Sequence, residues 1–182
     1  MADMMNKFVL FLAVDGFDSE SFEPLWLCFG NLNASTRIAS FHADDEIRDM
    51  QGRVNTYSDM SFAEAAEQRF DVLVVADGVT ANAIRGDLAA KTALMNASDW
   101  NSAIVSVEDA AIALIAAGIV EGQSIAAPPE LKEQLENAGA SLSDESIAIS
   151  NNIFSARKNA DMQSLCFLVS EYITSLGRGV AA

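Results

Sequence analysis

The chain has 182 residues, of which 51% are apolar, and its formal net charge is −15. This length and apolar content suit one domain over residues 1–182 with a sizeable core, and they argue against a disordered chain. The negative charge argues against nucleic acids and anionic membranes as partners, because their phosphates would repel the protein.

Membrane and secretory segments are not predicted either. No apolar run reaches the roughly 20 residues that a membrane-spanning helix needs. The first apolar segment ends at Asp15 with no cleavage-type sequence after it, so we interpret it as a core strand and not as a signal peptide. Cys28 and Cys166 lie in apolar helical patterns and form no motif, so each is expected to be a buried structural residue. A reducing cytoplasm is the simplest setting for such a chain.

The first half of the chain alternates between apolar runs that predict buried strands and segments with helical periodicity. Strands are expected at 8–14, 36–41 and 70–76, and helices at 19–29, 62–68, 81–84 and 88–96. Asp18 or Ser19 can cap the first helix, and Ser61 with Glu64 forms a capping box for the second. Residues 47–59 alternate apolar and polar residues, which predicts a β-hairpin. The residues expected to face inward on the last of these helices are Leu88, Ala89, Thr92 and Met95.

The central stretch, 101–122, has the layout of a nucleophile elbow. A buried strand is predicted at 103–107, an abrupt bend follows, and an Ala-rich helix then ends at Gly118. Strand and helix approach closely at such a bend, so small residues are needed two places on either side of its apex. Ser106 and Ala110 meet this requirement, and the apex between them is Glu108. A plain strand followed by an Ala-rich helix gives the same pattern, so that alternative stays open.

The rest of the chain continues the alternation. Strands are expected at 124–126, 140–143, 146–150 and 153–155, helices at 130–138 and 160–176, and a frayed tail at 177–182. Alternating strands and helices predict an α/β fold whose sheet is mainly parallel, with helices on both faces. Ligands of such sheets bind at the carboxyl ends of the strands. Three segments should converge there, namely 15–20, 77–78 and 108–109.

Five blocks of the sequence, in this order and spacing, resemble the DJ-1/PfpI (ThiJ) superfamily and especially its PfpI-like branch. The blocks are FVLFLAVDGFDSESFEP, FDVLVVADG followed by Ile84-Arg85, AIVSVEDAAIALIAAGIVEG, LKEQLENAGA and SIAISNNIFSAR. The resemblance spans nearly the whole chain. It implies a flavodoxin-like, class I glutamine amidotransferase-like three-layer sandwich that is usually a dimer.

The resemblance also shows where this chain departs from the family pattern. Counting back from Ala117-Gly118, the position of the family's nucleophilic cysteine is Glu108, and the histidine that often follows it is Asp109. The first glycine of the double-glycine block is Asp77, while the second is kept as Gly78. Because no thiol stands at the apex, the cysteine-dependent activities are not carried over. The only histidine, His42, follows the second strand, far from the predicted site, and is expected to be a solvated loop residue.

The remaining site residues follow from the family's layout. Glu20 matches the family's acidic residue and would lie against Glu108, so that the two carboxyl groups share a proton and one pKa rises. Such a pair could work as an acid/base catalyst or could be an inert polar network. Gly78 would direct a backbone N–H toward the bend as an oxyanion donor, or it could be a loop glycine with positive φ. Arg157 matches the Ser-Arg block, and its alternative is a surface or dimer-contact arginine.

Two functions are therefore compatible with the sequence. The first is a non-catalytic binding, stress-response or chaperone-like homodimer that takes a small-molecule ligand at the bend. The second is a hydrolase or lyase that acts on a small carbonyl or electrophilic substrate through Glu20 and Glu108. We expect neither to use a cofactor or a metal ion.

Overall fold

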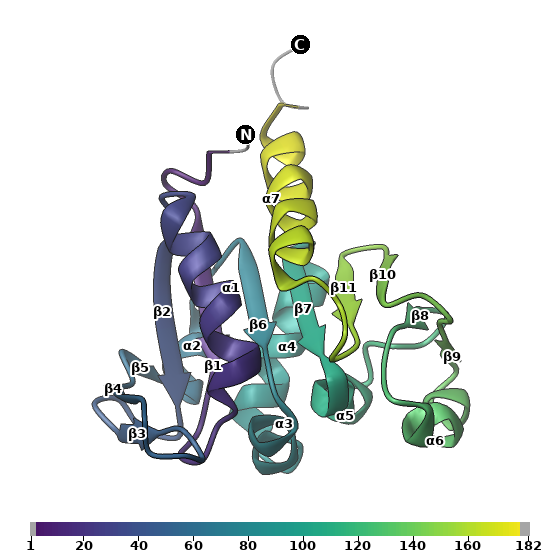
Figure 1. Cartoon of the computed structure of the whole chain (residues 1–182), viewed down its shortest axis with the longest axis horizontal. Coiled ribbons are helices and arrows are strands. Elements are labelled where there is room, and N and C mark those ends of the chain that lie inside the picture. The colour runs from purple at the N-terminus through teal and green to yellow at the C-terminus, as the bar shows by residue number, and fades with distance from the viewer. Residues whose placement is uncertain (1–2, 179–182) are drawn as a thin grey trace.

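A seven-stranded sheet forms the centre of the molecule in the computed structural model, which describes residues 3–178 (Figure 1). The spatial order of its strands is β10 (Ile147–Ser150), β11 (Ile153–Ala156), β7 (Ala103–Val107), β6 (Val72–Val75), β1 (Phe8–Leu12), β2 (Ser35–Ser40) and β5 (Met60–Ser61). Strand β10 pairs antiparallel with β11, and all the other neighbouring strands pair in parallel. The predicted α/β fold with a mainly parallel sheet is therefore confirmed.

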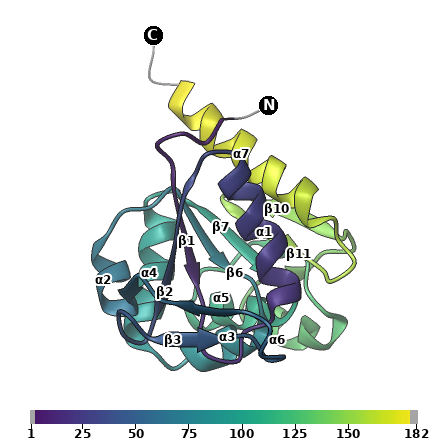
Figure 2. The same cartoon turned by 60° about the vertical axis from the view of Figure 1, so that its left-hand side comes forward.

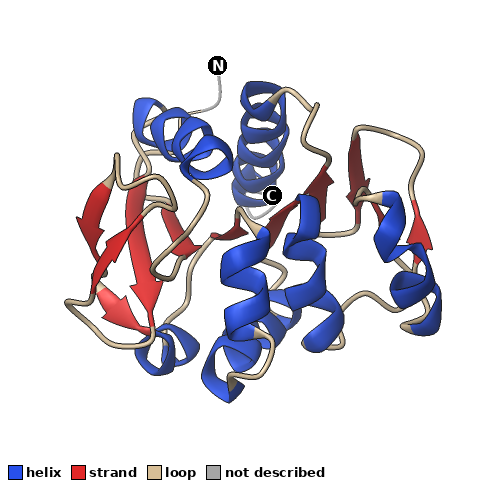
Figure 3. Ribbon diagram, turned by 60° about the horizontal axis from the view of Figure 1, so that its bottom comes forward, coloured by secondary structure: helices blue, strands red, loops and turns tan. Residues whose placement is uncertain are grey.

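Helices cover both faces of this sheet (Figure 3). One face carries α1 (Ser19–Asn31) and α7 (Met162–Arg178), and the other carries α2 (Phe62–Glu67), α3 (Gly78–Ile84), α4 (Leu88–Asp99) and α5 (Ala111–Ala116). Successive strand residues point to opposite faces, so Phe11 packs under α1 while Leu10 and Leu12 belong to the apolar cluster on the other side. Two cores separated by the sheet make the three-layer sandwich that was predicted.

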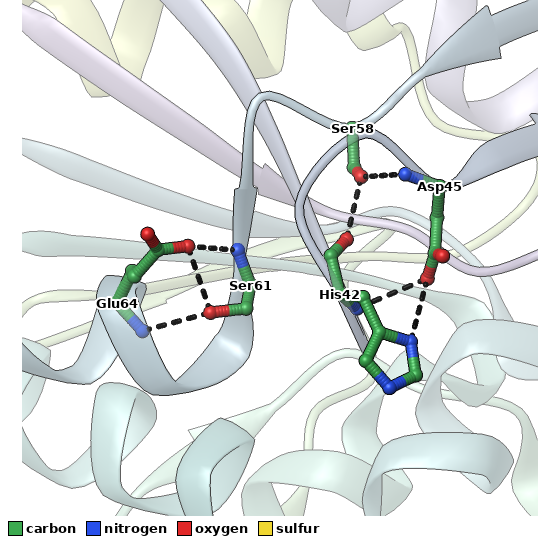
Figure 4. Close-up of polar contacts among 5 residues, drawn as sticks. All are labelled: His42, Asp45, Ser58, Ser61 and Glu64. Atoms are coloured by element: carbon green, nitrogen blue, oxygen red, sulfur yellow. Dashed lines mark hydrogen bonds and ion pairs between the residues drawn. The ribbon is translucent and has the colours of Figure 1, made fainter.

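Short elements complete the fold. The antiparallel pair β3 (Glu46–Arg48) and β4 (Asn55–Tyr57) is the hairpin predicted at 47–59. Beyond the other edge of the sheet lie η2 (Pro129–Leu131), α6 (Lys132–Asn137) and the parallel pair β8 (Ser124–Ile125) and β9 (Ser141–Leu142). The capping box of α2 is present, because Ser61 Oγ accepts the N–H of Glu64 at 3.2 Å and the Glu64 carboxylate accepts that of Ser61 at 2.8 Å (Figure 4).

Three local predictions are corrected by the structure. Helix α4 turns its Ala-rich stripe inward, which leaves Leu88 76% and Met95 49% exposed, because small side chains allow close packing there. Helix α3 begins three residues earlier than predicted, since the Asp77 carboxylate caps it by accepting the N–H of Thr80. Helix α7 runs on to Arg178, so the predicted tail is partly helical, and its remaining residues, 179–182, lie outside the described residues.

The largest correction concerns the cysteines. Cys28 on α1 and Cys166 on α7 form a disulfide, with their Cα atoms 6.5 Å apart. Cys166 is buried as expected, but Cys28 is only partly buried. No sequence motif indicated the pair, because 138 residues separate the two cysteines and only the packing of α1 on α7 brings them together. Cysteine usage therefore gives no argument for a reducing compartment. Within residues 3–178, no helix has both the length and the apolar character to cross a membrane.

Candidate functional site at the strand-to-helix bend

The site lies where the sheet order reverses. From β1 the chain moves outward to β2 and β5, then returns to β6 on the other side of β1, so the switch point lies between β1 and β6. Strands β1, β6 and β7 are neighbours, and their carboxyl ends share the edge that carries α3 and α5 at the bottom of Figure 1. The three loops predicted to converge therefore follow adjacent strands.

Glu108 forms the bend itself and has an unusual backbone conformation. Six non-glycine residues in the described chain have positive φ, and all except Glu108 are Asn or Asp, the residues that tolerate this region best. Glu108 has φ = 56°, which costs about 1–2 kcal/mol because its Cβ is crowded by the following carbonyl oxygen. The strand before it and Ala110 and Ala111 after it are buried, so the surrounding packing fixes this conformation.

The predicted small residues on either side of the bend are both fully buried. Ala110 lies in the short 3₁₀ turn η1 (Glu108–Ala110) that leads into α5. Ser106 lies on β7, and its hydroxyl has no hydrogen-bond partner within the part of the chain that the structure describes. Its neighbour in register on β11, Ser155, has an Oγ that accepts the N–H of Ala126 at 2.8 Å. The Ser106 hydroxyl therefore contributes nothing to the hydrogen bonding of the described core.

The Glu108 carboxyl is half-buried, and its pKa is raised above the ordinary value of 4.5. Partial burial is the largest cause, because it disfavours the charged form. The negative charges of Asp109 and Glu130 act in the same direction, while Lys158 and Arg157 oppose them. The bend therefore holds a carboxyl group that takes up a proton more readily than a solvated glutamate does.

Gly78 and Asp109 approach each other closely across the site. A Cβ atom at Gly78 would lie 2.7 Å from the Cβ of Asp109, a distance that would force one of the two elements to move. Gly78 is the first residue of α3, and it is not among the glycines with positive φ, so the alternative of a loop glycine with positive φ was wrong. The glycine is needed because the start of α3 packs directly on the bend.

Asp77 precedes Gly78 and is almost fully buried. Its carboxylate accepts the Thr80 N–H at 2.8 Å and the Thr80 hydroxyl at 2.9 Å. Burial raises the pKa of Asp77, the Asp18 carboxylate raises it further, and the bonds from Thr80 oppose the shift. Asp77 therefore acts chiefly as the cap of α3, and its acidic neighbour Asp18 belongs to the segment 15–20 that was predicted to converge here.

Arg157 lies at the end of β11 and is half-buried. Its Nε donates to the carbonyl of Ala127 at 3.1 Å and its Nη2 donates to the carbonyl of Ser143 at 2.5 Å. The guanidinium thereby joins two loops to the sheet and contributes positive charge near Glu108. Sequence reasoning missed Lys158 as a neighbour of Glu108. It could have been found from its place two residues after the end of β11, the strand that lies beside β7.

Glu20 is exposed in the first turn of α1, where its backbone N–H donates to Asp18 Oδ1 at 2.9 Å. Among the hydrogen bonds of the described residues, none joins Glu20 to Glu108. The expected proton-sharing pair stays a prediction. Its neighbour Ser19 is buried instead, and the Ser19 hydroxyl donates to the Asp49 carboxylate at 2.8 Å.

His42 lies in the loop after β2 and contacts Asp45 (Figure 4). Its backbone N–H donates to Asp45 Oδ2 at 3.0 Å, its Nδ1 lies 3.3 Å from the same oxygen, and Ser58 Oγ donates to its carbonyl at 2.7 Å. The imidazole ring is 82% exposed, so His42 belongs to a solvated loop as expected. Across residues 3–178, no group of three or more His, Cys, Asp or Glu side chains is arranged to hold a metal ion.

Comparison with known proteins shows the family to which this chain belongs. The model described as "DJ-1/PfpI family" matches residues 7–172. The chain belongs to the DJ-1/PfpI family. An uncharacterized protein of Staphylococcus epidermidis is 24% identical over 160 residues, which are 87% of this chain and 92% of that protein. An uncharacterized protein of Staphylococcus aureus is also 24% identical, over 87% of this chain and 93% of its own length.

Solved structures confirm the DJ-1/PfpI fold. DJ-1beta of Drosophila melanogaster superposes with a TM-score of 0.82 at 19% identity, covering 96% of this chain and 97% of that one. A two-domain protein of Anabaena variabilis, with DJ-1/ThiJ/PfpI-like and ferritin-like domains, gives a TM-score of 0.84 at 19% identity. The match covers 96% of this chain and 49% of the Anabaena chain, so this chain spans about half its length. At these identities the likeness concerns the fold alone.

Proposed function

We propose that this DJ-1/PfpI family member is a non-catalytic binding protein that holds a small polar ligand at Glu108. In this proposal Glu108 replaces the nucleophilic cysteine of the family, and residues 1–182 form one domain that works as a cytoplasmic homodimer in a stress-response or chaperone-like role. The observation that carries the proposal is the left-handed backbone of Glu108. A glutamate kept in a conformation that costs about 1–2 kcal/mol supports a role for its carboxyl group beyond folding.

Cysteine chemistry is not available at the bend. Both cysteines of the chain lie on α1 and α7 and are joined to each other, whereas thiolate catalysis needs a free thiolate at the apex. A carboxylate at that position instead offers two acceptor oxygens to a ligand. This supports recognition of a ligand by hydrogen bonds and charge.

The charges around Glu108 favour a ligand with N–H donors or positive charge. Asp109 and Glu130 add negative charge, and the Arg157 guanidinium already donates to two backbone carbonyls. Lys158, the residue after Arg157, is exposed and adds one more positive charge near Glu108. A small amine or amide could donate to the Glu108 carboxylate without competing with these contacts, whereas an anion would meet a predominantly negative edge.

Calorimetric titration of a series of small amines and amides tests this proposal. Binding should be lost in Glu108→Gln, which keeps the shape but removes the charge, and should be kept in Glu133→Gln, an exposed residue of α6. Equal binding by the wild type and Glu108→Gln would contradict the proposal. The homodimer is tested by sedimentation equilibrium, which should give twice the chain mass of 19.4 kDa.

The raised pKa of Glu108 favours a second candidate function, general acid/base catalysis on a small carbonyl or electrophilic substrate. Glu20 would be its partner, as predicted from the sequence. Glyoxalase, esterase and peptidase assays separate the two functions. Turnover that disappears in Glu108→Gln but persists in Cys28→Ser would establish the enzyme and overturn the binding protein. Activity gained in Glu108→Cys would show that the rest of the family's machinery is intact.

A further inference from the structure

The disulfide between Cys28 and Cys166 joins the two helices on one face of the sheet, which lie side by side in Figure 2. These are the only two cysteines in the sequence, so no other thiol in the chain can exchange with them. The pair lies on α1 and α7 rather than at the bend, and its chemistry does not rest on the function proposed for Glu108.

The two cysteine residues differ in their exposure to solvent. Cys166 is fully buried in the apolar cluster under α1 and α7, whereas Cys28 is partly exposed. Cys28 also lines a groove of about 330 Å³ between the helices, and Cys166 does not. A thiolate must reach a disulfide sulfur to attack it, so this asymmetry selects Cys28 as the attacked atom.

The lining of the groove indicates which thiols can enter it. Apart from Cys28, it consists of apolar and amide side chains with no charged group, namely Pro24, Leu27, Asn31, Leu32, Gln163 and Phe167. The net charge of −15 repels anionic reagents from the whole surface. An uncharged thiol of low mass fits both the volume and the lining.

We infer that Cys28–Cys166 is a thiol–disulfide exchange site, at which a low-mass uncharged thiol reaches the Cys28 sulfur through this groove. The incoming thiolate forms a bond to Cys28 Sγ, the Sγ–Sγ bond breaks, and its electron pair leaves on Cys166, which then takes up a proton. A second thiol attacks the mixed disulfide at the incoming sulfur and releases Cys28 as a thiol. Two thiols are oxidised to one small disulfide, and the protein cystine is reduced to two thiols.

Mass spectrometry after limited reduction tests the order of attack. The folded wild type is treated with 2-mercaptoethanol and quenched with iodoacetamide in guanidinium chloride, so that the buried Cys166 thiol is also alkylated. The expected intermediate carries the mixed disulfide on Cys28 and the alkyl group on Cys166. The reverse placement, or reduction only at the rate of global unfolding measured in the same buffer, would overturn the inference. The same rates measured with anionic 2-mercaptoethanesulfonate, at matched thiolate concentration, should be at least tenfold lower, and equal rates would count against the groove.

Single-cysteine variants give a second test that does not depend on the intermediate. With 2-hydroxyethyl disulfide, Cys28 in Cys166→Ser should be modified at least tenfold faster than Cys166 in Cys28→Ser. Gln163→Trp, which fills the groove, should slow the modification of Cys28, while Gln134→Trp on the exposed face of α6 should not. Equal reactivity of the two cysteines, or no effect of Gln163→Trp in a variant with native circular dichroism, would overturn the inference.

Discussion

At position 108, glycine should give a more stable protein than alanine, which is the opposite of their order in an ordinary helix. The left-handed backbone of Glu108 costs a residue with a Cβ atom about 1–2 kcal/mol, and glycine escapes this cost. Part of this advantage, roughly 0.4–1 kcal/mol, is lost because a glycine gives the unfolded chain more conformational freedom than an alanine does. Glu108→Gly should therefore be more stable than Glu108→Ala by about 1 kcal/mol. Both variants lack the carboxyl group, so their difference reports on the backbone alone.

The matched control is Glu171, an exposed residue inside the long helix α7. There Glu171→Ala should be more stable than Glu171→Gly by about 1 kcal/mol, because glycine is a poor helix former. Urea denaturation followed by circular dichroism gives all four free energies of unfolding, and thermal melts should show differences of about 2–4 °C for a chain of this length. If alanine is the more stable residue at both positions, Glu108 is not strained and the argument from its conformation is wrong.

Substitutions at three other places in the fold have outcomes that the structure fixes. Gly78→Ala should lower the free energy of unfolding by about 1–3 kcal/mol in urea titrations, and the double variant with Asp109→Gly should recover part of that loss, because it removes the atom that the new Cβ would meet. Ser106→Ala should be neutral or stabilising, whereas Ser155→Ala should cost about 1–3 kcal/mol because it leaves a buried N–H unpaired; equal losses would refute the assignment of the unpartnered hydroxyl. Cys28→Ser should destabilise the oxidised protein by about 2–5 kcal/mol and should have little effect in excess reductant, where the wild type also lacks the cross-link.

The sheet and the bend could be predicted because their signals are local. The apolar run 72–76 within the predicted strand 70–76 indicates a strand buried on both faces, and the small residues Ser106 and Ala110 indicate a close approach at Glu108. Each of these features is contained in a few neighbouring residues. Their order along the chain then allows only a few sheet arrangements, and the observed switch point between β1 and β6 follows from one of them.

The features that were missed depend on packing between distant segments. Cys28 and Cys166 are brought together by the contact of α1 with α7, which no local pattern records. The inward face of α4 was misjudged because alanine gives little contrast between buried and exposed positions. The clash that makes Gly78 necessary depends on where Asp109 lies in space. The sequence could therefore single out Gly78, but one of the two roles considered for it, a loop glycine with positive φ, was wrong.

The titration of Glu108 itself shows whether this residue presents a partly buried carboxyl group at the bend. A carbon-detected NMR pH titration of the glutamate carboxyl groups, with Glu108 assigned through Glu108→Gln, measures this pKa. The folded pKa should lie above 4.5, so the wild type binds more protons when folded and loses stability relative to Glu108→Gln as the pH rises from 4.5 through that value. A Glu108 pKa at or below 4.5, with no difference in the pH dependence of stability between the two proteins, would mean that the carboxyl group at the bend is fully solvated.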